Sequence, residues 1–383
     1  MDKYMLWLSA VNGFNGALGS KLLSHFGNAE NVYRADKKEL AGLLTPGALA
    51  NLIKSRDEIS PSQIIEGLEK TNTKVVFNPF LYDDKDKTIF QSNRTLYPKK
   101  LIDIPDPPLC LFYIGDLPRE EIPSVAIIGA RDCSNYGACE AREIGEYLGE
   151  KGIQTISGMA RGIDGISQEA TIGAGGLSYA VLGSGPDICY PRTNIRLYES
   201  LKTSGGIISL HPPGGPALPQ NFPPRNRIVS GLADAIIVIE ARQRSGTLIT
   251  VDMALEQGRD VYAVPGRITD RLSDGCNGII GQGANIFLSP EIFLNELLDS
   301  LNNLPNDKQK THRTFEGTKQ KELGLSEEQK KVYNCLEFSP TDISFVCEKI
   351  PEMTYTEILM ILMQLVIDGH AIQTSQEYFM RRH

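Results

Sequence analysis

The middle of the chain alternates short β-branched runs with helical patterns that glycines interrupt, and this alternation constrains the fold more than any other feature. Strands separated by helices of about 10–15 residues are typical of βαβ units, in which the strands lie parallel. We therefore predict an α/β fold with a doubly wound, mainly parallel sheet. The expected strands are residues 125–128, 154–156, 179–182, 207–210, 235–239 and 261–264, and the expected helices are residues 137–151, 163–172, 193–201, 224–232 and 247–257.

Regions of different composition flank the predicted sheet. Residues 1–80 show apolar side chains at helical spacing and predict a helical domain. The sheet domain is expected over residues 81–300, and the polar segment 301–322 predicts a linker. Residues 323–383 show three helical patterns followed by a hairpin pattern, which is the layout of a winged-helix domain. We thus expect three domains and one linker.

Composition excludes several classes of protein. No apolar run reaches the roughly 18–20 residues that span a bilayer, and Asp2 and Lys3 interrupt the apolar N-terminus, so we expect neither a membrane association nor a secretory signal. The seven cysteines include no C-x-x-C pair and no accompanying histidine cluster, so we expect no disulfide framework and no metal. The formal net charge of −8 argues against indiscriminate binding of polyanions. These features predict a cytoplasmic protein.

The first loop after a predicted strand departs from a dinucleotide-binding fingerprint. Ligands of open α/β sheets bind beyond the C-terminal ends of the strands, where helix N-termini offer unpaired N–H groups. The fingerprint G-x-G-x-x-G needs its second glycine so that the backbone can approach a pyrophosphate. This loop has Gly129, Arg131 and Ser134 at the three glycine positions. The arginine disfavours a docked dinucleotide and presents a guanidinium to an anion.

Arginine is concentrated in the predicted sheet domain. Residues 122–298 contain twelve Arg and two Lys, whereas the rest of the chain contains seven Arg and eighteen Lys. Arginine is preferred where a planar fork must grip phosphate or stack on a base, and most of these arginines fall in loops after predicted strands. Phe222 lies in one of the same loops, although a place in the core is the alternative for a Phe. Arginines with one exposed aromatic fit single-stranded nucleic acid.

The predicted site is a set of loop residues without a catalytic group. The arginines are expected to hold phosphates, the aromatic to stack a base, and the glycines to let the backbone approach the ligand. The predicted arginines are Arg131, Arg161, Arg225, Arg227 and Arg244, the predicted glycines are Gly129, Gly158, Gly183 and Gly246, and the predicted aromatic is Phe222.

Six segments, in this order, resemble the DNA-processing protein A (DprA/Smf) family. They are SGMARGID, YPRTN, FPPRNRIVSGLAD, EARQRSGTLIT, ALEQGRDVYAVPG and GCNGIIGQGA, and the resemblance covers about residues 97–298. The residues before and after this stretch are loosely similar to the family's helical SAM-like domain and its winged-helix end.

The resemblance implies a function and partners. It implies an extended Rossmann-like domain that binds and protects single-stranded DNA, with DNA contacts at Arg131, Gly158, Arg161 and Phe222. It also implies a homodimer that helps to load the RecA recombinase during natural transformation. The family has no established enzymatic turnover, so we expect no catalytic residue and no cofactor.

A departure and an alternative stay open. After the fourth predicted strand the family usually reads Ser-Glu-Tyr-Pro-Pro-Gly, whereas this chain has Leu210 and His211 at the second and third positions. The alternative function is a nucleotide-processing phosphoribohydrolase of the LOG, lysine-decarboxylase-like type, with the signature PGG-x-GT-x-x-E. Gly246 and Thr247 match its central turn, but Thr250 stands where the glutamate belongs. Hydrolysis of an N-glycosidic bond would then lack its acid or base.

The last predicted helix of the tail has an unsuitable charge for binding DNA. Residues 354–369 include Glu357 and Asp368 and no Lys or Arg. A recognition helix of this kind would repel phosphates. We therefore expect the tail to have a structural or protein-contact role.

Overall fold

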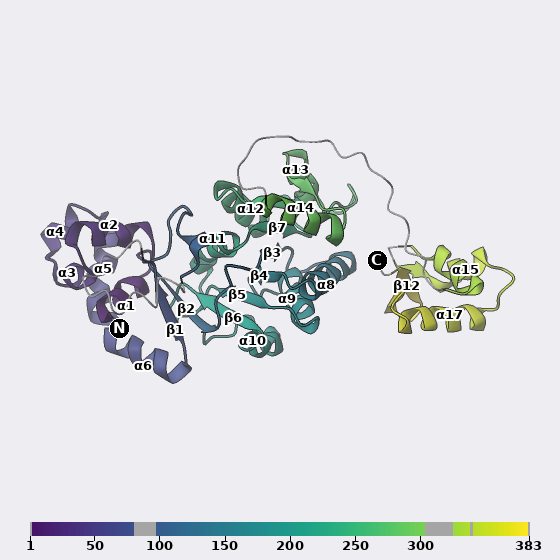
Figure 1. Ribbon diagram of the computed structural model, residues 1–383, viewed down its shortest axis with the longest axis horizontal. Helices are drawn as coiled ribbons and strands as arrows, with labels where there is room; N and C mark the ends of the chain where they lie inside the picture. Colours follow the sequence, from purple (N-terminus) through teal and green to yellow (C-terminus); the bar gives the residue numbers. More distant parts are fainter. Residues whose placement is uncertain (1, 80–96, 303–324, 338–339, 382–383) are drawn as a thin grey trace. The chain divides into compact units, whose positions relative to one another are not determined.

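The computed structural model describes residues 2–79, 97–302, 325–337 and 340–381 (Figure 1). The chain divides into two compact units, and the second, the C-terminal unit, comprises Leu298–His383 together with the short segment Ser134–Cys139. The first unit is built on a nine-stranded sheet with the strand order β1-β2-β6-β5-β4-β3-β7-β8-β9. Strands β3 to β9 are parallel to one another, and β1 and β2 add an antiparallel edge. The predicted α/β fold with a mainly parallel sheet is confirmed.

The parallel strands are short, and every residue of β3 to β7 is buried. Helices cover both faces of the sheet, so its strands are continuous apolar runs rather than alternating ones. The seven parallel strands are β3 (Ser124–Ile128), β4 (Gln154–Ser157), β5 (Ser178–Leu182), β6 (Gly205–Ser209), β7 (Ala235–Val238), β8 (Asp260–Ala263) and β9 (Asn285–Ile286). All six predicted strands are present, each within two residues of its expected bounds.

The connections make β3 and β7 the switch point of the sheet. From β3 the chain moves outward through β4 and β5 to β6, and then returns to β7 on the other side of β3. Helices α9 and α10 therefore lie on one face and α11 and α12 on the other (Figure 1). The helices of this region are α8 (Asn135–Glu150), α9 (Ile163–Gly173), α10 (Ile195–Leu201), α11 (Phe222–Leu232), α12 (Gly246–Glu256), α13 (Asp274–Gly281) and α14 (Pro290–Asn302), with the short 3-10 helices η2 (Arg192–Asn194) and η3 (Pro219–Asn221).

Within residues 2–79, six helices precede the first strand and share a core with the antiparallel edge of the sheet. Trp7 and Leu6 of the first helix are fully buried, and the same cluster reaches Cys110 and Phe112 of β2 (Cys110–Gly115). Asn15 fixes the junction, because its side-chain amide donates to the carbonyls of Cys110 and Leu210. The helices are α1 (Lys3–Ala10), α2 (Ala17–Phe26), α3 (Ala29–Arg34), α4 (Lys37–Ala41), α5 (Pro46–Glu58) and α6 (Pro61–Thr71), and the 3-10 helix η1 (Lys99–Leu101) lies before β2.

The expectation that residues 1–80 are entirely helical is wrong near their end. Strand β1 (Lys74–Phe77) follows α6 and pairs with β2, so that Val76 faces Leu111 across the ladder. The segment is rich in β-branched and aromatic residues, which favour a pleated surface when a partner strand is available. The partner strand β2 lies far along the chain, and local periodicity does not show a pairing between distant segments, so the sequence analysis predicted neither strand.

The described residues of the C-terminal unit from Leu325 onward form three helices and a three-stranded antiparallel sheet. The predicted helices and hairpin are present, and Val332, Val346, Leu362 and Phe379 are fully buried in its core. Its elements are α15 (Glu327–Cys335), β10 (Thr341–Asp342), α16 (Ile343–Lys349), α17 (Tyr355–Ile367), β11 (Ala371–Ser375) and β12 (Tyr378–Arg381), and the strand order is β10-β12-β11. The linker expected over residues 301–322 lies outside the described residues, except for its first two, which end α14.

Candidate nucleic-acid interface

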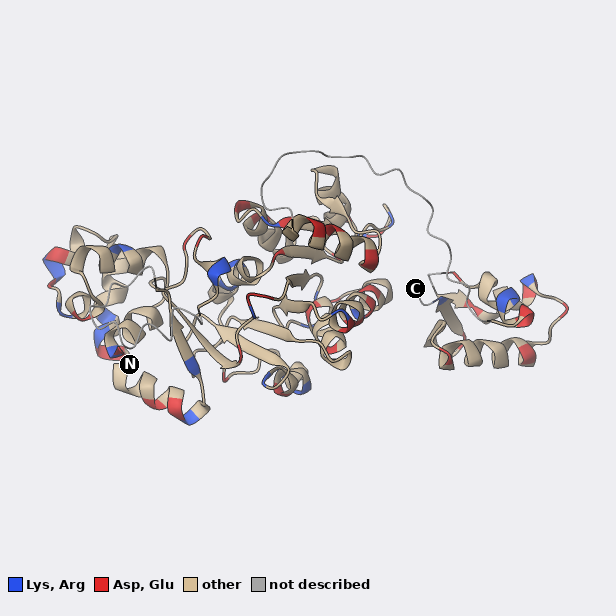
Figure 2. Cartoon of the chain, viewed as in Figure 1, with Lys and Arg blue, Asp and Glu red and all other residues tan. Residues whose placement is uncertain are grey.

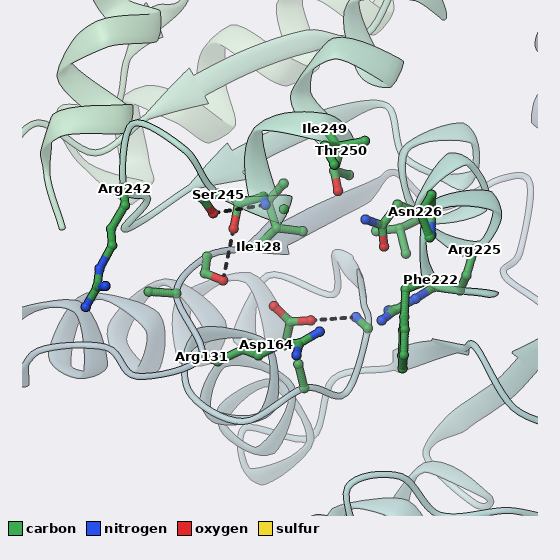
Figure 3. Close-up of a pocket in the computed structure, with 18 of the residues that line it drawn as sticks. Ile128, Arg131, Asp164, Phe222, Arg225, Asn226, Arg242, Ser245, Ile249 and Thr250 are labelled. Carbon is green, nitrogen blue, oxygen red and sulfur yellow. Dashed lines mark hydrogen bonds between the residues drawn. The ribbon is translucent and has the colours of Figure 1, made fainter. Parts of the chain in front are cut away.

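A pocket of about 690 Å³ opens at the C-terminal edge of the parallel strands (Figure 3). The loops after β3, β4 and β7 line it together with the start of α11, so it lies at the switch point of the sheet. Ligands of open α/β sheets bind at such points. Seven predicted site residues lie in its lining: Gly129, Arg131, Gly158, Phe222, Arg225, Arg244 and Gly246.

The ring of Phe222, at the start of α11, lies close to the guanidinium groups of Arg131 and Arg225. The central guanidinium carbons of Arg131 and Arg225 each lie 5.7 Å from the ring centroid. Cations near a ring face are attracted by its negative quadrupole, so both arginines help to orient the ring. Phe222 is half-buried and lines the pocket, and the alternative of a core position does not describe it.

Sequence reasoning missed a second aromatic residue of the pocket. Tyr190 lies in the loop after β5, its side chain is 48% exposed, and its ring centroid lies 5.9 Å from that of Phe222. The two tilted rings offer a surface on which a flat group can stack. The available signal was the position of Tyr190 in a strand-exit loop directly before Pro191 and Arg192.

Arg131 and Arg225 differ in their surroundings. Arg131 is exposed, whereas Arg225 is a buried part of the pocket wall, near the buried carboxylate of Asp164. The backbone N–H of Gly158 donates to Oδ2 of Asp164 at 3.1 Å. Burial raises the pKa of the Asp164 carboxyl, an effect that the nearby charge of Arg225 opposes. Burial also disfavours the charged form of Arg225 and lowers its pKa to about 10, an effect that the nearby charge of Asp164 opposes.

The N-terminus of α12 forms another wall of the pocket. Arg242 and Arg244 are exposed in the loop before it, and Ser245 caps the helix by accepting a hydrogen bond from the N–H of Thr247 at 3.1 Å. The hydroxyl of Thr247 donates to the carbonyl of Gly129 at 3.2 Å and so ties this wall to the loop after β3. A helix N-terminus flanked by guanidinium groups favours an anion. Arg242 was absent from the predicted site.

Two predicted arginines do not lie in the pocket lining. Arg161 forms an exposed ion pair with Asp132 at 2.7 Å, and Asp132 itself lines the pocket, so Arg161 stands at its rim. Arg227 points elsewhere, because its guanidinium forms an ion pair with Asp106 and its side chain is only 12% exposed. Burial lowers the pKa of Arg227 to about 10. The structure thus separates Arg227 from the other predicted phosphate ligands.

Three of the four predicted glycines have protein atoms where a side chain would begin. A Cβ at Gly129 would lie 2.6 Å from Cγ1 of Ile163, one at Gly183 would lie 3.0 Å from the Phe222 ring, and one at Gly158 would collide with the Arg225 guanidinium. Packing within the protein therefore already accounts for these glycines. Of the four predicted glycines, Gly246 alone has no described atom within 4 Å of an added Cβ, which leaves its backbone open to a ligand.

The pocket does not have the carboxylate that the hydrolase alternative requires. Thr250, at the position of the signature glutamate, does line the pocket. The two carboxylates of its described lining are Asp132, which is ion-paired, and Asp164, which is buried. The alternative function is therefore not favoured.

Leu210 is buried in the sheet core, so the departure from the usual family motif at this position does not change the pocket lining.

The sequence model of the DNA recombination-mediator protein A family matches residues 88–298, more than half of the chain. The chain belongs to this family. The match to the recombination-mediator family includes every residue that lines the pocket. Among the parts of the chain that the structure describes, no helix is long and apolar enough to cross a membrane, and no group of three His, Cys, Asp or Glu side chains is placed to hold a metal ion.

Curated relatives and a solved structure support the assignment to the recombination-mediator family. The DNA processing protein DprA of Streptococcus pneumoniae is 42% identical over 200 residues, which cover 52% of this chain and 71% of that protein. Protein Smf of Synechocystis is 35% identical over 308 residues, which cover 79% of this chain and 73% of that protein. The X-ray structure of DNA processing protein A from Streptococcus pneumoniae aligns with a TM-score of 0.63 and 32% identity, covering 77% of this chain and 98% of that one. The resemblance to DprA/Smf is confirmed, and so is a Rossmann-type sheet.

Proposed function

We propose that this protein binds single-stranded DNA at the pocket on the C-terminal edge of its sheet, without chemical turnover. The observation that carries the proposal is the half-buried ring of Phe222 beside the exposed Arg131 at the mouth of that pocket. An aromatic ring stacks on any base, and arginine binds the phosphates between bases. Membership of the recombination-mediator family supports DNA as the ligand.

The proposed ligands of phosphate are the exposed guanidinium groups of the pocket. Arg131, Arg242 and Arg244 reach it from the loops after β3 and β7. The open N-terminus of α12 at Gly246 adds backbone N–H groups. Arg225 has a different proposed role, since it is buried beside Asp164 and orients Phe222.

The arrangement favours single strands over duplex. A base must leave the helical stack to reach Phe222, and a duplex resists this because its bases are paired and stacked. Arginine contacts to the backbone alone would bind both forms. We therefore expect a short oligothymidine to bind much more tightly than a duplex of equal length.

A fluorescence anisotropy titration with labelled oligothymidine tests the proposal. Arg131→Ala is expected to weaken binding by about 1–3 kcal/mol, the value of a hydrogen bond to a charged group. The matched control is Arg119→Ala, because Arg119 is also exposed but precedes β3 and so lies at the opposite end of the parallel strands. Equal losses in both variants, or equal affinity for duplex and single strand, would contradict the proposal.

The partners implied by the family resemblance belong to the same proposal. We propose that the protein protects incoming DNA and helps to load RecA recombinase onto it during natural transformation, and that it acts as a cytoplasmic homodimer. The family description as a recombination mediator supports the RecA step. The direct check is whether the protein raises the DNA-dependent ATPase activity of RecA on strands coated with single-strand-binding protein, and whether Arg131→Ala removes this effect.

The domain boundaries are likewise proposed. We propose that residues 1–80 form a SAM-like domain whose last strand, β1, joins the neighbouring sheet, 81–300 a Rossmann-like DNA-binding domain, 301–322 a linker and 323–383 a winged-helix-like domain. Three helices followed by the β11–β12 hairpin support the last of these. Limited proteolysis should then cut first within 301–322.

A further inference from the structure

The outer face of α17 in the C-terminal unit carries a stripe of exposed apolar side chains. Met360, Met363 and Ile367 are three and four residues apart, so they share one face of the helix. Their exposed fractions are 65%, 40% and 74%. The opposite face of the same helix is buried in the core of the unit through Ile358, Leu362 and Leu365. An amphipathic helix needs one apolar face to pack on its own domain, and α17 has two.

Acidic and amide side chains border the stripe. Glu357 and Asp368 are exposed near the two ends of the helix, and the side chain of Gln364 donates to Asp368 at 2.9 Å. The helix has no Lys or Arg, and Figure 2 shows acidic but no basic positions along α17. The face is therefore an apolar ridge with a negative border. Nucleic acid would be repelled by that border.

We propose that the stripe Met360–Met363–Ile367 is a docking surface for a basic amphipathic helix of a partner protein. Such a helix would bury its own apolar face on the stripe and place Lys or Arg beside Glu357 and Asp368. Methionine side chains are flexible and polarisable, and they are frequent on surfaces that bind amphipathic helices. The stripe belongs to a unit other than the one that holds the DNA pocket, so this proposal does not depend on the proposed function.

Charge favours a basic partner over a second copy of this chain. An acid stands near each end of the stripe, Glu357 at the start of α17 and Asp368 directly after its end. Two copies of α17 packed in parallel would bring each acid to its own counterpart, and an antiparallel pair would bring Glu357 of one copy toward Asp368 of the other. Either arrangement places like charges together, which disfavours self-association.

A pair of model peptides tests the proposal with the full-length protein. The probe is a labelled 14-residue helix of Leu and Lys with one apolar face, and its counterpart carries Glu in place of every Lys. We expect the Leu/Lys peptide to bind at least tenfold more tightly than the Leu/Glu peptide. The triple variant Met360→Gln, Met363→Gln, Ile367→Gln should lose at least tenfold in affinity for the Leu/Lys peptide, since Gln keeps the helix propensity of Met.

A matched control separates the stripe from general attraction to an acidic protein. The double variant Leu255→Ser, Ile268→Ser removes two exposed apolar side chains, 59% and 91% exposed, from the first unit. It should bind the Leu/Lys peptide as the wild type does. If the triple variant melts at a lower temperature, the single variant Met360→Gln replaces it, with an expected loss of at least threefold. Equal binding by wild type and stripe variants would overturn the proposal.

Methionine oxidation shows what covers the stripe in the free protein. Met360 and Met363 should react readily with hydrogen peroxide and become protected when the Leu/Lys peptide is bound, as read by mass spectrometry. Met5 and Met380 are buried and serve as unreactive references. Protection of Met360 and Met363 in the free protein would overturn the proposal. Sedimentation would then show what covers the stripe. If a second copy covers it, the triple variant would be a monomer where the wild type is a dimer, and if a segment of the same chain covers it, the two would sediment alike.

Discussion

Arginines that all follow predicted strands in the sequence have different roles in the folded protein. Arg131 and Arg225 both follow predicted strands and both approach the ring of Phe222. Arg131 is exposed and can meet a ligand, whereas Arg225 is buried beside Asp164. Its Nε atom is also buried, with no acceptor for it among the described residues. Arg225 is therefore a positioning residue, and its loss should act on stability before it acts on binding.

The stacking role of Phe222 can be measured by truncating its ring. Phe222→Ala should weaken binding of oligothymidine by about 1–3 kcal/mol, because the stacked base loses its partner. Phe222→Tyr keeps the ring and should stay close to wild type. Anisotropy titrations at one fixed salt concentration compare the variants. A loss in Phe222→Tyr as large as that in Phe222→Ala would mean that the ring is not the contact.

The buried charges of Arg225 and Asp164 give a prediction about stability. Arg225→Met leaves the carboxylate of Asp164 buried without its opposite charge, which should lower the free energy of unfolding by about 3 kcal/mol. The second change Asp164→Asn should restore part of this loss, since it removes the uncompensated charge. Urea denaturation followed by circular dichroism measures both effects.

The same pair predicts a dependence on pH. Burial already raises the pKa of Asp164, and loss of Arg225 removes the charge that opposes this rise. An acid whose pKa is higher in the folded than in the unfolded state favours folding as the pH falls. The loss in the free energy of unfolding caused by Arg225→Met should therefore become smaller as the pH is lowered toward the pKa of Asp164. A deficit that grows on acidification would show that Asp164 is not the destabilising group.

At the scale of elements, the ends of strands and the starts of helices build the pocket. The loops after β3 and β7 meet because these strands are neighbours in the sheet, although three strands separate them in the chain. The hydroxyl of Thr247 at the start of α12 bonds the carbonyl of Gly129 after β3 and holds the two loops together. The sequence predicted each loop, and the strand order brought them to one place.

The start of α12 can be tested by adding a single methyl group. Gly246→Ala should leave stability unchanged or raise it by up to about 1 kcal/mol, because an added Cβ meets no atom and Ala favours a helix. Affinity for oligothymidine should fall about tenfold if a phosphate approaches this backbone. Gly278→Ala in α13 is the control, since an added Cβ there is also free and Gly278 lies outside the DNA pocket. Unchanged affinity in Gly246→Ala would remove α12 from the interface.

At the scale of the whole molecule, the protein gathers cationic side chains at one pocket although the chain as a whole is acidic. The net charge is −8, yet the described exposed charges of the pocket lining are dominated by Arg131, Arg242 and Arg244. Two other predicted arginines, Arg161 and Arg227, are paired with acids within the protein. Local segregation of charge, and not the total, then decides whether a polyanion binds.

The salt dependence of binding counts these free cations. Three phosphates neutralised at about 0.7 each should give a slope near −2 when the logarithm of the association constant is plotted against the logarithm of the salt concentration. A fourth phosphate held by Arg161 would make the slope about −3. Binding titrations of a short oligothymidine at several salt concentrations, from low to physiological, measure this slope. A slope near zero would contradict electrostatic binding at the pocket.

The sequence by itself determined the parallel sheet, the loops at its C-terminal edge and the family. These depend on short-range patterns, because a β-branched run with a helix after it carries its own signal whatever it later contacts. It missed β1 and β2, whose pairing joins segments far apart in the chain. It also could not show which guanidinium groups remain free.

Only the tertiary structure decided that question. Arg161, Arg225 and Arg227 each lie near an acid that is distant in sequence, namely Asp132, Asp164 and Asp106. Contacts of this kind follow from strand order and helix packing, which local periodicity does not encode. The same holds for α17, whose apolar residues all resemble core until folding buries one face and leaves Met360 and Ile367 outside.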